Sequence, residues 1–282
     1  MAELPTTTTA IVTSANITVL AAAKAKKTKA LKATPPAELP EVNFSDYDGV
    51  RSLHLGTLWI QGSMRMDDPY ILELEYVQRM MAWLLFVEPT SVGKRHAMQL
   101  GLGAASLTKF CRKTLRMTVT AIELNPQVVI ACRGWFKLPQ DEPRQRVVLA
   151  NAETEIQNPM WHGTVDALQV DLYDQDAAAP VLDSEAFYAD CRRLLTEDGS
   201  MTVNLFGLSS SYPMSLEKIT AVFGADAVWA FKPTREGNTV VLAQRTPVRP
   251  TKAVLTERAQ AIFSRWELPA LKWLRVFKPA KV

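Results

Sequence analysis

The stretch HAMQLGLGAASLTKFCRK, from His96 to Lys113, decides how the surrounding sequence is interpreted. A short apolar run meets a Gly-x-Gly turn, and small residues then lead into a helical pattern over residues 104–116. Glycine allows a backbone to approach another group closely, so a strand–turn–helix of this kind can present N–H groups to a ligand. The candidate ligand-binding residues of this turn are Gly101, Leu102, Gly103 and Ala104.

Strand-like and helix-like segments alternate along the chain after this turn. The strand-like runs are HAMQLGLG, VTAIEL, RVVLAN, DALQVDLYD and SMTVNLF, and two closing strands, AVWAF and NTVVLAQ, flank the turn KPTREG. Helical patterns separate the first five runs, and one of them begins at Asn125 and Pro126, which suit a helix cap and a first helical position. This alternation predicts an α/β fold with a Rossmann-like, seven-stranded, mostly parallel sheet covered by helices on both faces.

The segments on either side of this core have different patterns. Residues 1–40 are rich in Thr, Ala and Lys and contain several prolines, which predicts a disordered tail. Residues 41–68 hold short strand-like pieces and predict a small β element. We assign residues 69–248 to the main domain, whose first helix is expected to begin at Asp68 and Pro69. Residues 249–282 are expected to form a helical extension that is interrupted at Pro269.

The bulk composition argues against several classes of protein. The net charge of +3 arises in the first forty residues, where five lysines face two glutamates, so residues 41–282 are formally neutral and lack a nucleic-acid-binding footprint. The three cysteines and three histidines show no metal-ligand spacing, and no apolar run approaches the ~20 residues of a membrane span. We therefore expect a cytoplasmic protein with reduced thiols and no metal, nucleic-acid or membrane partner. The composition of residues 1–40 also has some similarity to a transit peptide.

Polar side chains follow consecutive strands where each strand ends. In a parallel sheet these ends meet at one edge, where ligands bind. Glu123 is placed to hold both ribose hydroxyls of a nucleoside, the alternative being a solvated strand-end carboxylate, and Asn151 can pair with an adenine edge. Asp171 and Asp174 suit a cationic group at the reactive end. Ser106 stands where a dinucleotide fingerprint has its third glycine, so the pattern favours a sulfonium nucleoside.

These motifs resemble the spermidine synthase-like family, the polyamine aminopropyltransferases built on the class I methyltransferase fold, over about residues 45–245. The family's loop G-G-G-D-G-G is GLGAAS here, its strand-end acid lies in AIELNPQVV, and its D-S-S-D segment followed by E-x-F-Y is VDLYDQD…DSEAFYADC. Asp171 is the proton acceptor that the resemblance implies. The other implied site residues are Gln61, Tyr76, Tyr173 and Asp174 for the acceptor, and Gly101, Leu102, Gly103, Ala104, Glu123, Leu124, Asn151 and Ala152 for the donor. Core packing is the alternative interpretation of Tyr76.

The resemblance implies transfer of an aminopropyl group from decarboxylated S-adenosylmethionine to a polyamine such as putrescine, by a homo-oligomer such as a dimer. Two positions depart from the family pattern. Ala104 replaces the aspartate that holds the aminopropyl ammonium, and Asn151 replaces the aspartate at the adenine. Two alternatives stay open at this point: an S-adenosylmethionine-dependent methyltransferase, and a non-catalytic nucleoside-binding or interaction protein of the same fold.

Overall fold

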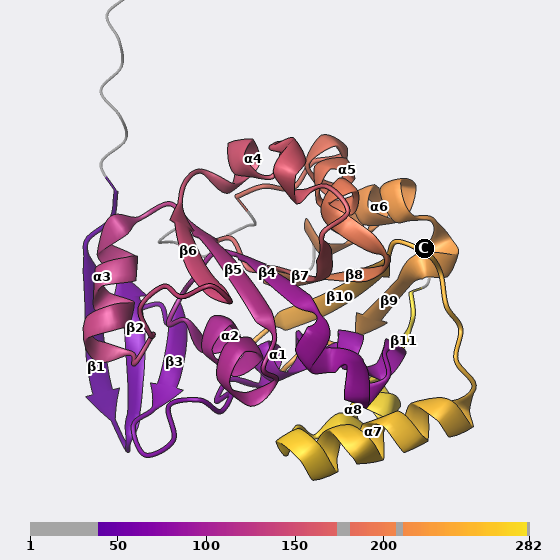
Figure 1. Ribbon diagram of the computed structural model, residues 1–282, viewed down its shortest axis with the longest axis horizontal. Coiled ribbons are helices and arrows are strands. Elements are labelled where there is room, and N and C mark those ends of the chain that lie inside the picture. The colour runs from indigo at the N-terminus through magenta and orange to yellow at the C-terminus, as the bar shows by residue number, and fades with distance from the viewer. Residues whose placement is uncertain (1–38, 174–180, 207–210, 281–282) are drawn as a thin grey trace, which may run out of the picture. The chain divides into compact units, whose positions relative to one another are not determined.

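The computed structural model of the chain describes residues 39–173, 181–206 and 211–280 (Figure 1). The tail predicted for residues 1–40 lies outside these ranges except for its last two residues, and Asp174 also lies outside them. Within the described ranges the chain forms two sheets, a small antiparallel one followed by a larger mixed one.

The small sheet precedes the main domain. Its strands are β1 (Val42–Tyr47), β2 (Val50–Leu55) and β3 (Gly62–Arg65), in the order β1-β2-β3. The two residues between β1 and β2, Asp48 and Gly49, have φ values of 47° and 75°, which is the geometry that an Asp-Gly pair favours in a tight hairpin. The strands expected between residues 41 and 68 are therefore present.

The main sheet contains eight strands within the described ranges, in the order β11-β9-β10-β8-β7-β4-β5-β6. The strands are β4 (His96–Leu100), β5 (Thr118–Glu123), β6 (Gln145–Leu149), β7 (Val165–Val170), β8 (Leu195–Phe206), β9 (Val228–Phe231), β10 (Asn238–Gln244) and β11 (Phe277–Pro279). Strands β4 to β8 pair in parallel with one another, whereas the pairs that involve β9, β10 and β11 are antiparallel. This is the predicted mostly parallel sheet, with β11 added to the seven expected strands.

Helices cover both faces of the main sheet (Figure 1). They are α1 (Glu75–Arg79), α2 (Ser106–Lys109), α3 (Pro126–Trp135), α4 (Ala152–Glu155), α5 (Glu185–Leu194), α6 (Ser211–Phe223), α7 (Lys252–Trp266) and α8 (Ala270–Val276), with short 3₁₀ or π turns at Ala82–Phe86, Pro89–Lys94, Phe110–Thr114, Pro159–Trp161 and Ala225–Ala227. On β10, Val241 belongs to the core under α5 and α6, whereas Val240 belongs to the core under α7 and α8. Alternate residues of one strand thus fill opposite layers, as the two-residue period of a strand requires.

Short polar side chains fix where several helices begin. The Oδ1 atom of Asn125 accepts the N–H of Gln127 at 2.9 Å, and Pro126 occupies the first turn of α3, as predicted. The Oγ atom of Ser184 accepts the N–H of Phe187 at 3.1 Å and caps α5 in the same way. These caps fix the residue at which each helix begins, directly after a strand or loop.

The first helix of the main domain does not begin at the predicted position. The Oδ1 atom of Asp68 accepts the N–H of Tyr70 at 3.3 Å, and this local turn competes with a helix start. Helix α1 begins only at Glu75 and ends after five residues. The apolar face that the sequence indicated is nevertheless buried, with Met80 and Trp83 at 0% and 1% exposure.

Candidate functional site

A glycine-rich turn joins β4 to α2. Gly101 and Gly103 have φ values of 87° and 50°, and Ala105 has a φ of 57° in the same left-handed region. A Cβ atom at Gly101 would lie 2.3 Å from the carbonyl oxygen of Asp171, and one at Gly103 would lie 2.8 Å from that of Gln61. Packing within the chain itself therefore requires both glycines, whereas the sequence had suggested only that they leave room for a ligand.

The same turn also packs against β3 of the small sheet. A Cβ atom at Gly62 would lie 2.6 Å from the backbone nitrogen of Ala104 and 2.9 Å from its Cβ atom. The hydroxyl of Ser106 donates to the carbonyl oxygen of Ser63 at 2.7 Å. Because Ala104 is 1% exposed, a larger side chain at this position has no room unless β3 moves.

Glu123 closes β5 beside the turn. Its Oε2 atom accepts the N–H of Leu102 at 2.9 Å, and its Oε1 atom accepts the N–H of Asn125 at 2.8 Å. Burial raises the pKa of Glu123, and these backbone bonds oppose the rise. A carboxylate oxygen accepts more than one hydrogen bond, so Glu123 can also accept the two hydroxyls of a ribose. The neighbouring Leu124 is 53% exposed.

Asn151 and Ala152 follow β6, the next strand of the sheet. The N–H of Ala150 donates to the carbonyl oxygen of Glu123 at 2.9 Å, so the ends of β5 and β6 lie side by side. The Oδ1 atom of Asn151 accepts the N–H of Glu153 at 2.9 Å and caps α4. Asn151 is exposed and Ala152 is buried. The pairing of Asn151 with an adenine edge stays a prediction.

Asp171 follows β7 and receives hydrogen bonds from two other elements. The hydroxyl of Tyr76 donates to Oδ2 at 3.1 Å, and the Nδ2 atom of Asn204 donates to Oδ1 at 2.9 Å. Burial raises the pKa of Asp171 to about 6, and the two hydrogen bonds limit that rise. Burial and the nearby carboxylate raise the pKa of Tyr76 well above its ordinary value, so its phenol stays a neutral donor at pH 7. The carboxylate is thus ionised at neutral pH and able to accept a proton.

Tyr173 ties the segment after β7 to the end of β8. Its hydroxyl donates to the main-chain carbonyl of Asn204 at 2.9 Å and accepts the N–H of Phe206. The ring of Phe206 lies edge-on between Tyr173 and Trp59, with ring centroids 6.3 Å and 6.0 Å away. Two other residues predicted for the acceptor also lie near the turn and Asp171. Tyr76 contacts Asp171 through its hydroxyl, and the carbonyl of Gln61 lies against Gly103.

Asn204 and Asn238 are polar residues beside Asp171 that the sequence interpretation missed. Asn204 lies near the end of β8 and Asn238 opens β10. The Nδ2 atom of Asn238 donates to the Oδ1 atom of Asn204 at 3.1 Å. One signal was available in the sequence, because SMTVNLF places a single amide in an otherwise apolar strand end, at the same sheet edge as the other predicted residues.

No model of a protein family matches the sequence. The chain is 32% identical over 232 residues to the polyamine aminopropyltransferase of Chromobacterium violaceum, a match that covers 82% of this chain and 86% of the relative. It is also 32% identical over 231 residues to the polyamine aminopropyltransferase of Neisseria meningitidis serogroup B, covering 81% and 86%. The chain belongs to the polyamine aminopropyltransferase family.

Solved structures with a similar fold include two spermidine synthases. The match to a probable spermidine synthase from Corynebacterium glutamicum has a TM-score of 0.65 at 18% identity and covers 82% of this chain and 87% of that chain. The match to spermidine synthase from Thermotoga maritima has a TM-score of 0.62 at 17% identity and covers 84% and 81%. Human methyltransferase-like protein 13 in complex with SAH matches with a TM-score of 0.63 at 21% identity over 69% and 93%. The fold of this polyamine aminopropyltransferase-family chain is thus the class I methyltransferase-like fold.

The described part of this polyamine aminopropyltransferase-family chain holds no cluster of three or more His, Cys, Asp or Glu side chains placed for a metal ion. Over the same residues, no helix has both the length and the apolar character needed to cross a bilayer.

Cys111, Cys132 and Cys191 are buried free thiols, and Cys132 donates to the carbonyl of Gly103 at 3.1 Å.

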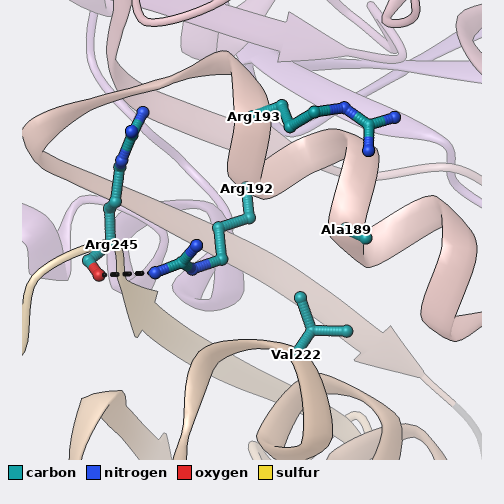
Figure 2. A pocket seen from close by; sticks show the side chains of 5 residues that line it. All are labelled: Ala189, Arg192, Arg193, Val222 and Arg245. Carbon is teal, nitrogen blue, oxygen red and sulfur yellow. Dashed lines mark hydrogen bonds between the residues drawn. The ribbon is translucent and has the colours of Figure 1, made fainter.

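A separate hollow of about 360 Å³ is lined by Ala189, Arg192, Arg193, Val222 and Arg245 (Figure 2). It lies toward the opposite sheet edge from Asp171, because Arg245 follows the end of β10 that pairs with the first half of β8. Arg192 donates to the main-chain carbonyl of Arg245 at 3.3 Å, Arg193 pairs with Asp190, and Arg245 pairs with Glu197 at 3.0 Å. The three guanidinium groups thus already have partners within the chain.

Proposed function

We propose that the chain transfers the aminopropyl group of decarboxylated S-adenosylmethionine to an amine of a small polyamine such as putrescine. The observation that carries the proposal is the Asp171 carboxylate at the carboxyl edge of the sheet, held by Tyr76 and Asn204 and placed against the glycine-rich turn. Membership of the family supports it, since both relatives described above are polyamine aminopropyltransferases.

The reaction is a displacement at carbon. The lone pair of a neutral amine attacks the methylene carbon next to the sulfonium, so a C–N bond forms while the C–S bond breaks. The electron pair of the C–S bond goes to sulfur, which leaves as the neutral thioether methylthioadenosine. The attacking nitrogen becomes positively charged and loses a proton, which Asp171 accepts. Since the leaving group is neutral, the site needs alignment and a base but no general acid.

The donor's nucleoside fits the glycine-rich turn, Glu123 and Asn151 in this proposal. Glu123 accepts the ribose hydroxyls, Asn151 pairs with the adenine, and the turn supplies close backbone packing. Ala104 contributes no charge to the aminopropyl ammonium. A hydrogen bond to a charged group is worth about 1.5–3 kcal/mol, so we expect the donor to bind about ten- to a hundredfold more weakly than it would with a carboxylate at this position.

The acceptor lies on the side of Tyr76 and Tyr173 in this proposal, with Gln61 and Asp174 as further contacts, of which Asp174 lies outside the described residues. Carboxylates beside the reacting nitrogen suit a diamine, which carries a second ammonium group at neutral pH. We also expect the chain to act as a homo-oligomer, such as a dimer, in the cytoplasm.

A second candidate is methyl transfer from S-adenosylmethionine. The observation that favours it is the buried, uncharged Ala104, because S-adenosylmethionine keeps a carboxylate that an acidic side chain at this position would repel. Both donors share the nucleoside, so Glu123 and Asn151 do not discriminate between them.

The purified full chain incubated with putrescine and each donor separately discriminates the two. Decarboxylated S-adenosylmethionine is expected to yield methylthioadenosine and spermidine, and Asp171→Asn is expected to abolish most of that yield. S-adenosylhomocysteine from S-adenosylmethionine would support the second candidate instead. If no methylthioadenosine forms, or if Asp171→Asn forms it as fast as the unchanged chain, the aminopropyl transfer proposed here is wrong.

A further inference from the structure

Two buried asparagines form a hydrogen-bonded chain of side chains that ends at the carboxylate of Asp171. Asn238 donates through Nδ2 to the Oδ1 atom of Asn204 at 3.1 Å, and Asn204 donates through Nδ2 to the Oδ1 atom of Asp171 at 2.9 Å. The two amides are 8% and 4% exposed. They come from adjacent antiparallel strands, since Val240 of β10 pairs with Asn204 and Asn238 pairs with Phe206.

An amide side chain has a donor end and an acceptor end of nearly the same shape. With its nitrogen toward Asp171, Asn204 stabilises the carboxylate; rotated by half a turn, it would present a carbonyl oxygen to a negative charge. Shape alone does not choose between these two states. The Asp171 carboxylate only accepts hydrogen bonds and favours the first state, and a donor at the other end of the amide adds to that preference. Asn238 supplies that donor, because its N–H₂ group bonds to the carbonyl end of Asn204.

Asn238 is itself held in place by the turn before β10. Its backbone N–H donates to the hydroxyl of Thr234 at 3.1 Å, and the N–H of Thr234 donates to the carbonyl of Asn238 at 2.7 Å. Gly237 makes this turn with a φ of 98°, and a Cβ atom at that position would lie 3.7 Å from the ring of Phe206. These bonds hold the main chain of Asn238, so the β9–β10 turn fixes the position from which the side chain of Asn238 reaches Asn204.

We propose that Asn238 is a positioning residue, which fixes the amide of Asn204 so that its N–H₂ group and not its carbonyl faces the Asp171 carboxylate. The effect of Asn238 on catalysis rests on the proposed aminopropyl transfer, in which Asp171 accepts a proton. Asn238 does not touch Asp171 and acts only through Asn204.

The other groups that face Asp171 do not supply this orientation. Tyr76 of α1 bonds to the second carboxylate oxygen, Oδ2. Tyr173, on the same segment as Asp171, uses its hydroxyl on the main chain of β8. Both are neutral phenols at pH 7, and burial raises the pKa of each. Among the described residues, no Lys, Arg or His forms an ion pair with Asp171.

The test compares Asn238→Leu and Asn204→Leu with the double variant. Leucine keeps the branched shape of asparagine with some added bulk and removes both polar ends. In a carbon-13 NMR titration of the Asp171 carboxyl, assigned from the spectrum of Asp171→Asn, we expect the pKa to rise by about one in Asn204→Leu and by about half as much in Asn238→Leu. The double variant is expected to match Asn204→Leu alone, because Asn238 has no route to Asp171 other than Asn204.

Asn238→Ala provides the same test without added bulk if the leucine variant does not fold, and Thr239→Val is the matched control. Thr239 is the next residue of β10, is also buried, and points to the opposite face of the sheet. An unchanged pKa of Asp171 in the Asn238 variants, or a further rise in the double variant, would overturn the proposal. So would an equal rise in Thr239→Val.

Activity adds a second readout that separates this proposal from the proposed function. If the chain makes methylthioadenosine, the acid limb of kcat for Asn238→Leu should move to higher pH by the same amount as the NMR titration, with little change in the KM of the donor. If the chain makes none while the titration shifts as expected, aminopropyl transfer fails and the positioning of the Asp171 carboxylate still stands. A lower activity with an unmoved pH profile would point to a merely structural role for Asn238 and contradict the proposal.

Discussion

Replacing Asp171 by asparagine should make the protein more stable and nearly inactive. Asparagine has the same shape and keeps both hydrogen bonds, since its Oδ1 atom accepts from Asn204 and its Nδ2 group can donate to the hydroxyl of Tyr76. The substitution therefore removes the charge and leaves the packing intact. What changes is the cost of holding a carboxylate in a partly buried position.

The size of the gain follows from the pKa. Asp171 has an ordinary value of 3.8, which burial raises to about 6 in the folded protein. The folded state thus holds the proton more tightly than the unfolded chain does, so the free energy of unfolding falls as the pH rises from about 4 to about 6. At about 1.4 kcal/mol for each pH unit, the loss reaches about 3 kcal/mol and stays constant above pH 6. Asp171→Asn does not titrate and escapes this loss.

Urea denaturation of both proteins at several values between pH 4 and pH 8 measures the difference. We expect equal stability near pH 4 and an advantage of about 3 kcal/mol for Asp171→Asn at pH 8, with methylthioadenosine formation reduced about 10²- to 10⁴-fold. Asp226→Asn is the control, because Asp226 is 92% exposed and its loss should change little at any pH. An advantage that is absent at pH 8, or equally large at pH 4, would refute the reasoning.

Three further predictions concern the turn and its surroundings. Gly103→Ala should lower the free energy of unfolding by more than about 2 kcal/mol, because the new Cβ would lie 2.8 Å from the carbonyl oxygen of Gln61. Gly134→Ala is the control: its Cβ would have nothing within 4 Å, so the free energy of unfolding should rise by up to about 1 kcal/mol. Urea denaturation of the two variants measures both changes. Burial lowers the pKa of Lys109 from 10.5 to about 8, which costs about 3.4 kcal/mol at pH 7, while its ammonium donates to the carbonyl oxygen of Phe136 at 2.6 Å. Lys109→Met should therefore add about 2 kcal/mol at pH 7, because loss of that hydrogen bond offsets about 1.5 kcal/mol of the gain. The gain should shrink as the pH rises from 8 toward 10.5, and a gain that does not change with pH would count against this prediction. Glu123→Gln should weaken the binding of methylthioadenosine at least about tenfold in calorimetry, because the amide nitrogen that replaces one carboxylate oxygen cannot accept a ribose hydroxyl. Unchanged affinity would contradict the assigned role.

The fold was predictable because it depends on local patterns that agree with one another. Asn125 and Pro126 start α3 directly after β5, and the apolar strands recur at the spacing that a parallel sheet needs. The prediction failed at Asp68, where a side chain that can cap a helix instead stabilises a turn. It also did not include β11, because a three-residue strand shows no period of its own and forms only by pairing with β9.

The candidate site was predictable as far as the strand ends and no further. Asp171 and Glu123 lie at the end of strands that the sequence marks, and the sheet brings those ends to one edge. Asn204 and Asn238 were not predicted, because their link depends on the antiparallel register of β8 and β10, which distant residues set. The packing contacts that require Gly101 and Gly103 could likewise not be predicted, because Gln61 and Asp171 are distant in sequence and meet the turn only in the folded chain.

The contact between Gly62 and Ala104 restricts how this chain could change by mutation. Ala104 is 1% exposed and lies against Gly62 of β3, so we expect a carboxylate at position 104 to lower the stability unless β3 shifts. Selection for tighter donor binding would first have to accept substitutions in the turn between β2 and β3 that let Gly62 move away. Directed evolution of this protein should therefore find paired changes near residues 57–63 and 104, in that order.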